Sequence, residues 1–396
     1  MGLAALLLVA ASPADTPLPV GGPELERAVA AGESQAFVAA LAAGRAYHLA
    51  VEQRGIDVVI AVHGPEGSSV ATVDGPLDRW GVETVLLRPV AAGSYRVEVR
   101  TEKKGVGAGR YAIRLDELPG ATPADRERLA ALEAMTRGGA ALVGRPAGSL
   151  DKALAAFQEA REHCKAAGDR RWETESLAAL AAVAHLAGRQ RQAVDSYREL
   201  ATRWQELQQP ARELRAWADL GLTLWEMSDL PAADDALARG LTLAERLGET
   251  YSKTELQSTQ CLVLHARGAV QPALDCYREV RALYHQLGEA QEEASVLNNL
   301  GYAYYNLGEP QPAEENYRQA LAIRQTIGDR AGEAQALNNL AVLFRNLGEI
   351  DEALADYGAA QKILASLDDR RQEAATANNM GVAYSALGEA ERGEPI

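Results

Sequence analysis

The chain has 396 residues, of which 47% are hydrophobic and 24% charged, and its formal net charge is −15. This length is too great for one hydrophobic core and predicts two or three domains. The acidic balance argues against a general binder of nucleic acid or of anionic membranes, because such proteins neutralise phosphate with Lys and Arg. A local basic groove remains compatible with these totals.

Residues 1–22 are interpreted as a signal peptide and linker. The apolar run Leu3–Ala11 in MGLAALLLVAASPADTPLPV is too short to span a bilayer. It resembles the h-region of a signal peptide, with Val9 and Ala11 at the −3 and −1 positions of a cleavage site, although the positive n-region is missing. We therefore expect a periplasmic or secreted protein, and a cytoplasmic one is the alternative. No other segment is apolar enough to cross a membrane.

Residues 23–118 predict an all-β sandwich. Runs such as AYHLAVEQ, ETVLLRPV and SYRVEVRT alternate apolar and polar residues, and Gly, Pro and Asp turns separate them. The stretches VEQRGIDVV, GPEG and GSYRV resemble the pre-peptidase C-terminal type of domain, a small jelly-roll-like sandwich of exported bacterial proteins. Asp57, Asp74 and Glu83 offer oxygen ligands for calcium, but they lack an ordered spacing, so turn and strand-end carboxylates are the favoured interpretation.

A helical linker is expected over residues 119–134, because Thr122, Pro123 and Asp125 suit the start of a helix. Residues 135–396 then carry a repeat of 40 residues, which NNLGYAYYNLGE at 298, NNLAVLFRNLGE at 338 and NNMGVAYSALGE at 378 show directly. Three columns extend the register backwards: a glycine, an alanine five residues later, and a large apolar residue four beyond that. The glycine column comprises Gly148, Gly188, Gly268, Gly308, Gly348 and Gly388, with Ser228 in the one gap.

Each repeat predicts a helical hairpin. Leu297, Leu300, Gly301 and Tyr304 recur on one face of a first helix, Gly308 provides its C-terminus, and a second helix carries the stripe Ala313, Tyr317 and Ala320. These columns resemble the tetratricopeptide repeat family, in a 40-residue variant like that of kinesin light chains. The resemblance implies an all-α superhelical solenoid of about six and a half hairpins, of which the last is incomplete. The fold class expected for the whole chain is therefore multidomain, with the β-sandwich first.

Polar side chains opposite the core stripe are expected to line the concave groove of such a solenoid. In the family that the chain resembles, asparagine in the column of Asn299 commonly grips the main chain of a ligand, and tyrosines offer rigid anchors. The alternative is that the asparagines bond between neighbouring repeats, with Asn299 reaching a backbone carbonyl. The candidate peptide-binding residues are Asn298, Asn299, Tyr302, Tyr305, Asn306, Asn338, Asn339, Arg345, Asn346, Asn378 and Asn379.

We identify no catalytic residue, cofactor or metal site in the sequence. No P-loop, GxSxG, HExxH or dinucleotide fingerprint occurs, and the neighbours His163 and Cys164 would point about 100° apart on a helix. Cys261 and Cys276 are interpreted as buried small apolar residues, and a disulfide between them is conceivable.

The expected function is a non-catalytic scaffold that binds a protein or peptide segment. Two alternatives remain. The domain order resembles the front part of bacterial proteins that end in a caspase-like CHAT peptidase domain, which implies a sensor or regulatory role for a protease domain beyond this chain. A glycan-binding or adhesion role of the β-sandwich is the other. The open last hairpin is compatible with a homo-oligomer.

Overall fold

The computed structural model describes residues 15–77, 79–101, 108–120, 122–144, 146–367 and 369–386. The apolar run of the expected signal peptide lies outside these residues. The chain divides into two compact units, one of residues 1–102 with 109–176 and one of residues 103–108 with 177–396. Each unit is described separately below.

The first unit contains the expected β-sandwich. Its two sheets have the strand orders β1-β3-β8-β5-β6 and β2-β9-β4-β7, and the pairing is antiparallel except between β1 and β3. Among the described residues the strands are Thr16–Pro17 (β1), Leu25–Val29 (β2), Ser34–Leu41 (β3), Ala46–Arg54 (β4), Val59–His63 (β5), Ser69–Val73 (β6), Trp80–Leu87 (β7), Gly93–Arg100 (β8) and Gly109–Leu118 (β9).

Alternation along the strands builds the core between the two sheets. In β4 Tyr47, Leu49 and Val51 are buried, whereas the intervening residues are half-buried and lie on the outer face. Phe37 of β3 and Tyr111 of β9 meet edge to face with ring centroids 6.4 Å apart, so aromatic packing joins the two sheets directly.

A helical hairpin completes the first unit. Thr122 caps α1 (Pro123–Leu142) in a capping box with Asp125, and α2 (Ser149–Ala166) packs against α1. The helix expected at 119–134 therefore continues to Leu142 and forms the first helix of a hairpin. It also contacts β7, where the backbone N–H of Leu86 donates a 2.8 Å hydrogen bond to Oγ1 of Thr136.

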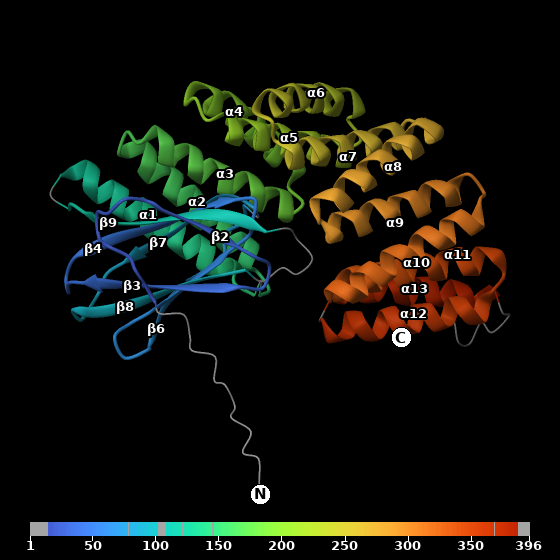
Figure 1. Cartoon of the computed structure of the whole chain (residues 1–396), viewed down its shortest axis with the longest axis horizontal. Helices are drawn as coiled ribbons and strands as arrows, with labels where there is room; N and C mark the ends of the chain where they lie inside the picture. The colour runs from blue at the N-terminus through green and yellow to red at the C-terminus, as the bar shows by residue number, and fades with distance from the viewer. Residues whose placement is uncertain are drawn as a thin grey trace, which may run out of the picture. The chain divides into compact units, whose positions relative to one another are not determined.

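The second unit is an array of antiparallel hairpins, as the repeat predicts (Figure 1). The odd-numbered helices are the first helices of the repeats, and α4 and α6 lie along the outer side of α5 and α7 in this view. The helices are Arg170–Leu186 (α3, which crosses the boundary of the units), Gln190–Glu206 (α4), Pro210–Glu226 (α5), Leu230–Leu247 (α6), Thr250–Ala266 (α7), Val270–Leu287 (α8), Ala290–Asn306 (α9), Pro310–Ile327 (α10), Arg330–Leu347 (α11), Ile350–Ser366 (α12) and Arg370–Ala386 (α13).

The predicted core stripe is confirmed. Leu297 and Leu300 of α9 are 0% and 2% exposed, and Ala313 and Tyr317 of α10 are 0% and 3% exposed. Gly301 permits this approach, because a Cβ atom placed there would lie 2.6 Å from the Tyr317 ring. The hairpin therefore depends on a small residue where its two helices cross.

Turns between helices use left-handed backbone. Gly308 lies in the turn between α9 and α10 and has φ +75°. Two non-glycine residues adopt the same region, Ser228 with φ +62° and Gln208 with φ +54°. Both occupy columns that hold glycine in other repeats, so the register imposes the conformation at these two positions against the preference of the side chain.

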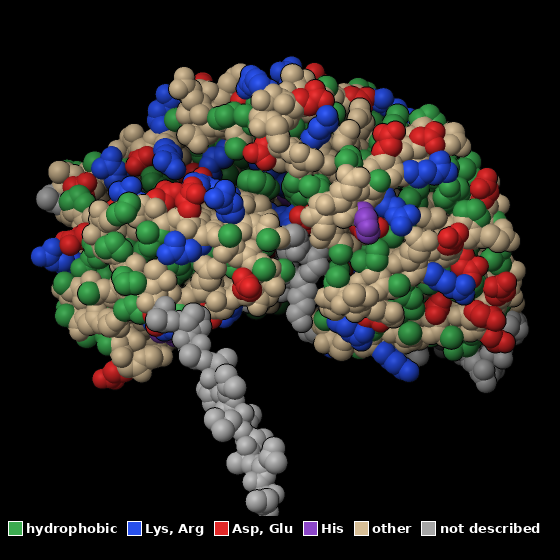
Figure 2. All heavy atoms as spheres, viewed as in Figure 1, with side chains coloured by type: hydrophobic (Ala, Val, Ile, Leu, Met, Phe, Trp, Pro, Cys, Tyr) green, Lys and Arg blue, Asp and Glu red, His purple; other side chains and the backbone are tan. Residues whose placement is uncertain are grey.

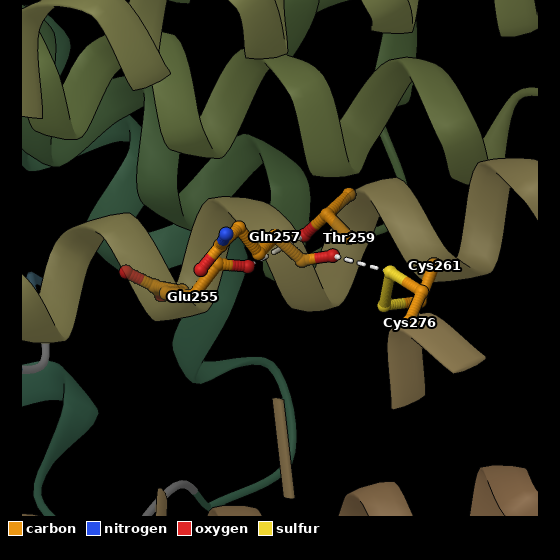
Figure 3. Close-up of a disulfide and its surroundings, with 5 residues drawn as sticks. All are labelled: Glu255, Gln257, Thr259, Cys261 and Cys276. Carbon is orange, nitrogen blue, oxygen red and sulfur yellow. Dashed lines mark hydrogen bonds between the residues drawn. A yellow bond between two sulfur atoms is a disulfide. The ribbon is translucent and has the colours of Figure 1, made fainter. Parts of the chain in front are cut away.

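A disulfide links the two helices of one hairpin. Cys261 of α7 and Cys276 of α8 are bonded, with their Cα atoms 5.5 Å apart (Figure 3). The disulfide that the sequence left open is therefore formed, and Cys261 is also buried, as expected. The disulfide closes a loop of 15 residues that includes the turn between α7 and α8.

Candidate functional site

Asparagines of α9, α11 and α13 bond to one another across repeats. Nδ2 of Asn339 donates to Oδ1 of Asn298 at 2.8 Å, and Nδ2 of Asn379 donates to Oδ1 of Asn338 at 3.2 Å. In both pairs the donor lies 41 residues after the acceptor. We call the surface formed by Asn298, Asn299, Asn338, Asn339, Asn378 and Asn379 the amide face.

The expected alternative, bonding between repeats, is thus realised through side chains rather than through a backbone carbonyl. In each pair one asparagine uses only its oxygen and the other uses only its NH₂ group, so the remaining polar group of each side chain is available to a ligand. A carboxamide has two N–H donors and an oxygen with two lone pairs, so Asn298 keeps its NH₂ group and Asn339 keeps its oxygen. Asn299 is half-buried and Asn378 is exposed. The amide face therefore retains both donors and acceptors.

Aromatic side chains continue the site toward the C-terminal ends of α7 and α9. The Tyr302 and Tyr305 rings are stacked with centroids 6.5 Å apart, and the His265 ring lies 5.3 Å from Tyr302. Hydrogen bonds again run between repeats: Asn306 pairs with Nε2 of His265 at 3.1 Å, and Asn346 donates to the Tyr305 hydroxyl. Hydrogen bonds to neighbouring repeats therefore orient the His265 and Tyr305 side chains.

One apolar column crosses this surface. Tyr302 and Val382 are 53% and 55% exposed, and Val342 between them is half-buried. Exposed apolar side chains of this size on successive helices are typical of a contact surface. Arg345 adds a cation beside the column, and its guanidinium lies 3.4 Å from Oδ1 of Asn346.

His265 is a member of the site that the sequence did not reveal. It is half-buried on α7, and burial lowers its pKa, so the imidazole is neutral at pH 7. The alignment of the 40-residue repeats could have indicated His265, since position 265 shares a column with Tyr305 and Arg345.

Ion pairs replace amides in the preceding repeats. Arg215 of α5 binds both oxygens of Glu255 of α7 at 2.8 and 3.0 Å, and also binds Asp219 at 2.5 Å. These charges neutralise one another between two first helices. The asparagines that bond between repeats therefore lie on α9, α11 and α13.

The carboxylates considered for calcium form a different arrangement. Glu83 is 2% exposed and accepts a 3.1 Å hydrogen bond from Nε2 of Gln53. Burial, together with the nearby charges of Asp74 and Asp57, raises the pKa of Glu83 well above its usual value. Within the described ranges, no group of three or more His, Cys, Asp or Glu residues is placed to hold a metal ion.

His163 and Cys164 contact different partners. Nδ1 of His163 lies 2.7 Å from Glu127, whereas Sγ of Cys164 lies 3.8 Å from Oγ of Ser176. The two side chains therefore do not form a dyad.

Figure 2 shows basic and acidic side chains interspersed on the visible face of the helical array. None of the helices in the described part of the chain has the length and apolar character that a membrane crossing requires.

Comparison with known proteins supports the assignment of the repeats. A family model described as the tetratricopeptide repeat matches residues 253–326 and 332–392, so these residues are tetratricopeptide repeats. No curated protein sequence matches the chain.

Solved structures share the fold at low identity. Aspartyl phosphate phosphatase F from Bacillus subtilis is 14% identical with a TM-score of 0.54, and the match covers 67% of this chain and 69% of that one. NprR in complex with its cognate peptide NprX is 15% identical with a TM-score of 0.51, covering 69% and 76%. A signal-transduction ATPase with a tetratricopeptide repeat sensor, from Pyrococcus horikoshii, is 15% identical with a TM-score of 0.51, covering 69% and 43%. At these identities the matches establish the fold alone.

Proposed function

We propose that the chain is a scaffold that binds an extended peptide segment of a partner protein along the amide face. The observation that carries this proposal is the half-satisfied pairing of Asn298 with Asn339 and of Asn338 with Asn379. An extended main chain presents N–H and C=O groups in alternation, and the amide face offers the complementary acceptors and donors at each repeat.

The bonds between repeats favour this role because they fix the side chains before a ligand arrives. A free asparagine side chain loses rotamer entropy when it binds, at a cost on the order of 0.5–1.5 kcal/mol for each side chain that is immobilised. Asn339 and Asn379 are already held by the preceding repeat. Preorganised amides therefore bind a main chain at lower entropic cost.

The stacked tyrosines supply the apolar part of the same surface. Tyr302 and Tyr305 present rigid rings with polar tips, and aromatic anchors of this kind provide much of the binding free energy at interfaces. We expect an apolar side chain of the partner on Tyr302, whose ring is the more exposed of the two. The structure of NprR supports the proposal, since that protein has a similar fold and is in complex with its cognate peptide.

Selection from a displayed random-peptide library tests the proposal. The purified chain should enrich peptides, and replacing Asn299 and Asn339 together by Ala should weaken binding of the selected peptides roughly tenfold or more, the scale of a hot-spot loss. Gln311→Ala is the matched control, because it removes an exposed amide from the second helix α10. Equal binding by the double variant, or no enrichment at all, would overturn the proposal.

We also propose that the chain works in an oxidising compartment after export. The Cys261–Cys276 disulfide supports this, because such bonds persist in secreted and periplasmic proteins and are rare in reducing cytosol. In that setting the β-sandwich would position the helical array or tether it. Fractionation of the producing cell, with the mass of the mature N-terminus, tests the location.

A further inference from the structure

The first unit contains a pocket of about 70 Å³ beneath its helices. It lies where the outer face of β4 and β9 meets α1, α2 and the beginning of α3. The side chains that matter here are His48 from β4, Met135 from α1, Cys164 from α2 and Trp172 from α3. Arg128 and Asp169 also line the pocket and form an ion pair at 3.3 Å.

His48 brings an imidazole nitrogen to this pocket with no protein partner. Alternation along β4 places the side chain on the outer face of the sheet, and the His48 and Trp172 rings pack edge to face with centroids 5.0 Å apart. Nε2 is buried without a hydrogen bond. Burial lowers the pKa of His48 to about 4, so the ring is neutral at pH 7 and one nitrogen carries a free lone pair.

Two sulfur-bearing side chains, Met135 and Cys164, line the same pocket. Both sulfurs contact one hydroxyl, because Oγ of Ser176 lies 3.5 Å from Sδ of Met135 and 3.8 Å from Sγ of Cys164. The single hydroxyl proton of Ser176 has a better acceptor in the carbonyl of Trp172 at 2.8 Å. Both sulfurs therefore keep lone pairs available, and Met135 and Cys164 are 7% and 2% exposed.

Size and chemistry restrict what this pocket can hold. Pockets for organic ligands usually exceed about 300 Å³, so a volume of about 70 Å³ suits an ion or one or two waters. A buried water needs two to four polar partners, and here it would find one nitrogen, two weak sulfur acceptors and the Arg128 and Asp169 side chains, which already bind each other. Nitrogen, thiol and thioether donors together match a soft cation better than water.

We propose that His48, Met135 and Cys164 bind copper(I). Nε2 of His48, Sδ of Met135 and the thiolate of Cys164 would be the three ligands, and the bound ion would displace one proton from the Cys164 thiol. Soft thioether and thiolate donors select copper(I) over hard divalent ions. Because a proton is displaced from the thiol, the affinity should increase with pH.

The test is an anaerobic titration of the full chain with copper(I) against the chelator bicinchoninate. No thiol reductant is added, so that the disulfide stays intact. We expect one equivalent bound, and at least tenfold weaker binding in each of the variants His48→Gln, Met135→Leu and Cys164→Ser. The double variant Cys261→Ser/Cys276→Ser is the control and should bind as the parent does. Thermal melting confirms that each variant is folded; Met135→Leu conserves volume and keeps the test decisive if another variant unfolds.

X-ray absorption at the copper edge supplies the second measurement. Nitrogen and sulfur scatterers in the parent chain, with loss of a sulfur in Met135→Leu, support the site. Binding no stronger in the parent than in Cys164→Ser, or no binding in competition with the chelator, would overturn it.

Discussion

Asn339 of α11 donates its side-chain amide to Asn298 of α9, one repeat earlier, and the same relation joins Asn379 to Asn338. This bond has two consequences. It couples neighbouring repeats, and it leaves one donor group and one acceptor group of each pair for a ligand. The polar pair that is unfavourable within an isolated helix is therefore explained by contacts between helices.

The amide pair predicts a measurable coupling in stability. A double-mutant cycle with Asn298→Ala and Asn339→Ala should give an interaction free energy of about 0.5–1.5 kcal/mol, the net contribution of a single hydrogen bond. Urea unfolding measures it. The matched cycle with Asn298→Ala and Asn346→Ala should be additive, because Asn346 bonds to Tyr305 instead. Additivity in the first cycle would contradict the bond.

Gly301 should not tolerate a methyl group. A Cβ atom at this position would lie 2.6 Å from the Tyr317 ring, so Gly301→Ala should lower the free energy of unfolding by about 1–3 kcal/mol through overpacking. Gly358 of α12 provides the control, since a Cβ atom added there would have nothing within 4 Å. Gly358→Ala should raise stability by up to about 1 kcal/mol. The same sign for both variants would be evidence against the close crossing.

Two turn residues should be improved by glycine. Ser228 and Gln208 have φ +62° and +54°, where a side chain costs about 1–2 kcal/mol. Ser228→Gly and Gln208→Gly should remove this cost. Because glycine loses more entropy on folding than other residues, the net rise in the free energy of unfolding should be roughly 0.5–1 kcal/mol for each variant. Gly308→Ser makes the reverse change and should be destabilising. A gain with Gly308→Ser would contradict the assigned backbone.

Reduction of the disulfide should weaken the second unit. A closed loop of 15 residues corresponds to about 3 kcal/mol in the chain-entropy treatment. Chemical denaturation with and without dithiothreitol measures this difference, and Cys261→Ala/Cys276→Ala should remove the response. Cys164→Ala should retain it, because Cys164 is a free thiol. If dithiothreitol still lowered the stability of the double variant, the disulfide would not be the cause of the response.

Glu83 predicts how stability depends on pH. Its pKa is raised in the folded state, so the folded chain holds its proton where the unfolded chain has lost it. This contribution is present below the unfolded pKa of about 4.3 and is lost as pH rises toward the folded value. Glu83→Gln should therefore stabilise the first unit more at pH 7.5 than at pH 5, by urea unfolding. An equal effect at both pH values would contradict a raised pKa.

Sequence periodicity predicted the hairpins because one column of small residues and one of aromatic residues recur at a fixed spacing. The identity of the partner of each asparagine was not predictable, since it depends on how one repeat is staggered against the next. The disulfide was likewise only conceivable from sequence, because the crossing of α7 and α8 sets the distance between Cys261 and Cys276. His265 was missed because a single histidine in a helix usually packs without a specific role.

The side-chain amide resonances of asparagine test the central proposal most directly. In a chain labelled with ¹⁵N-asparagine, addition of a peptide selected from the library should shift the signals of Asn298, Asn299 and Asn339, whereas Asn316 on the second helix α10 should not move. Resonances of the amide face that stay unchanged while the peptide binds would contradict the proposed site.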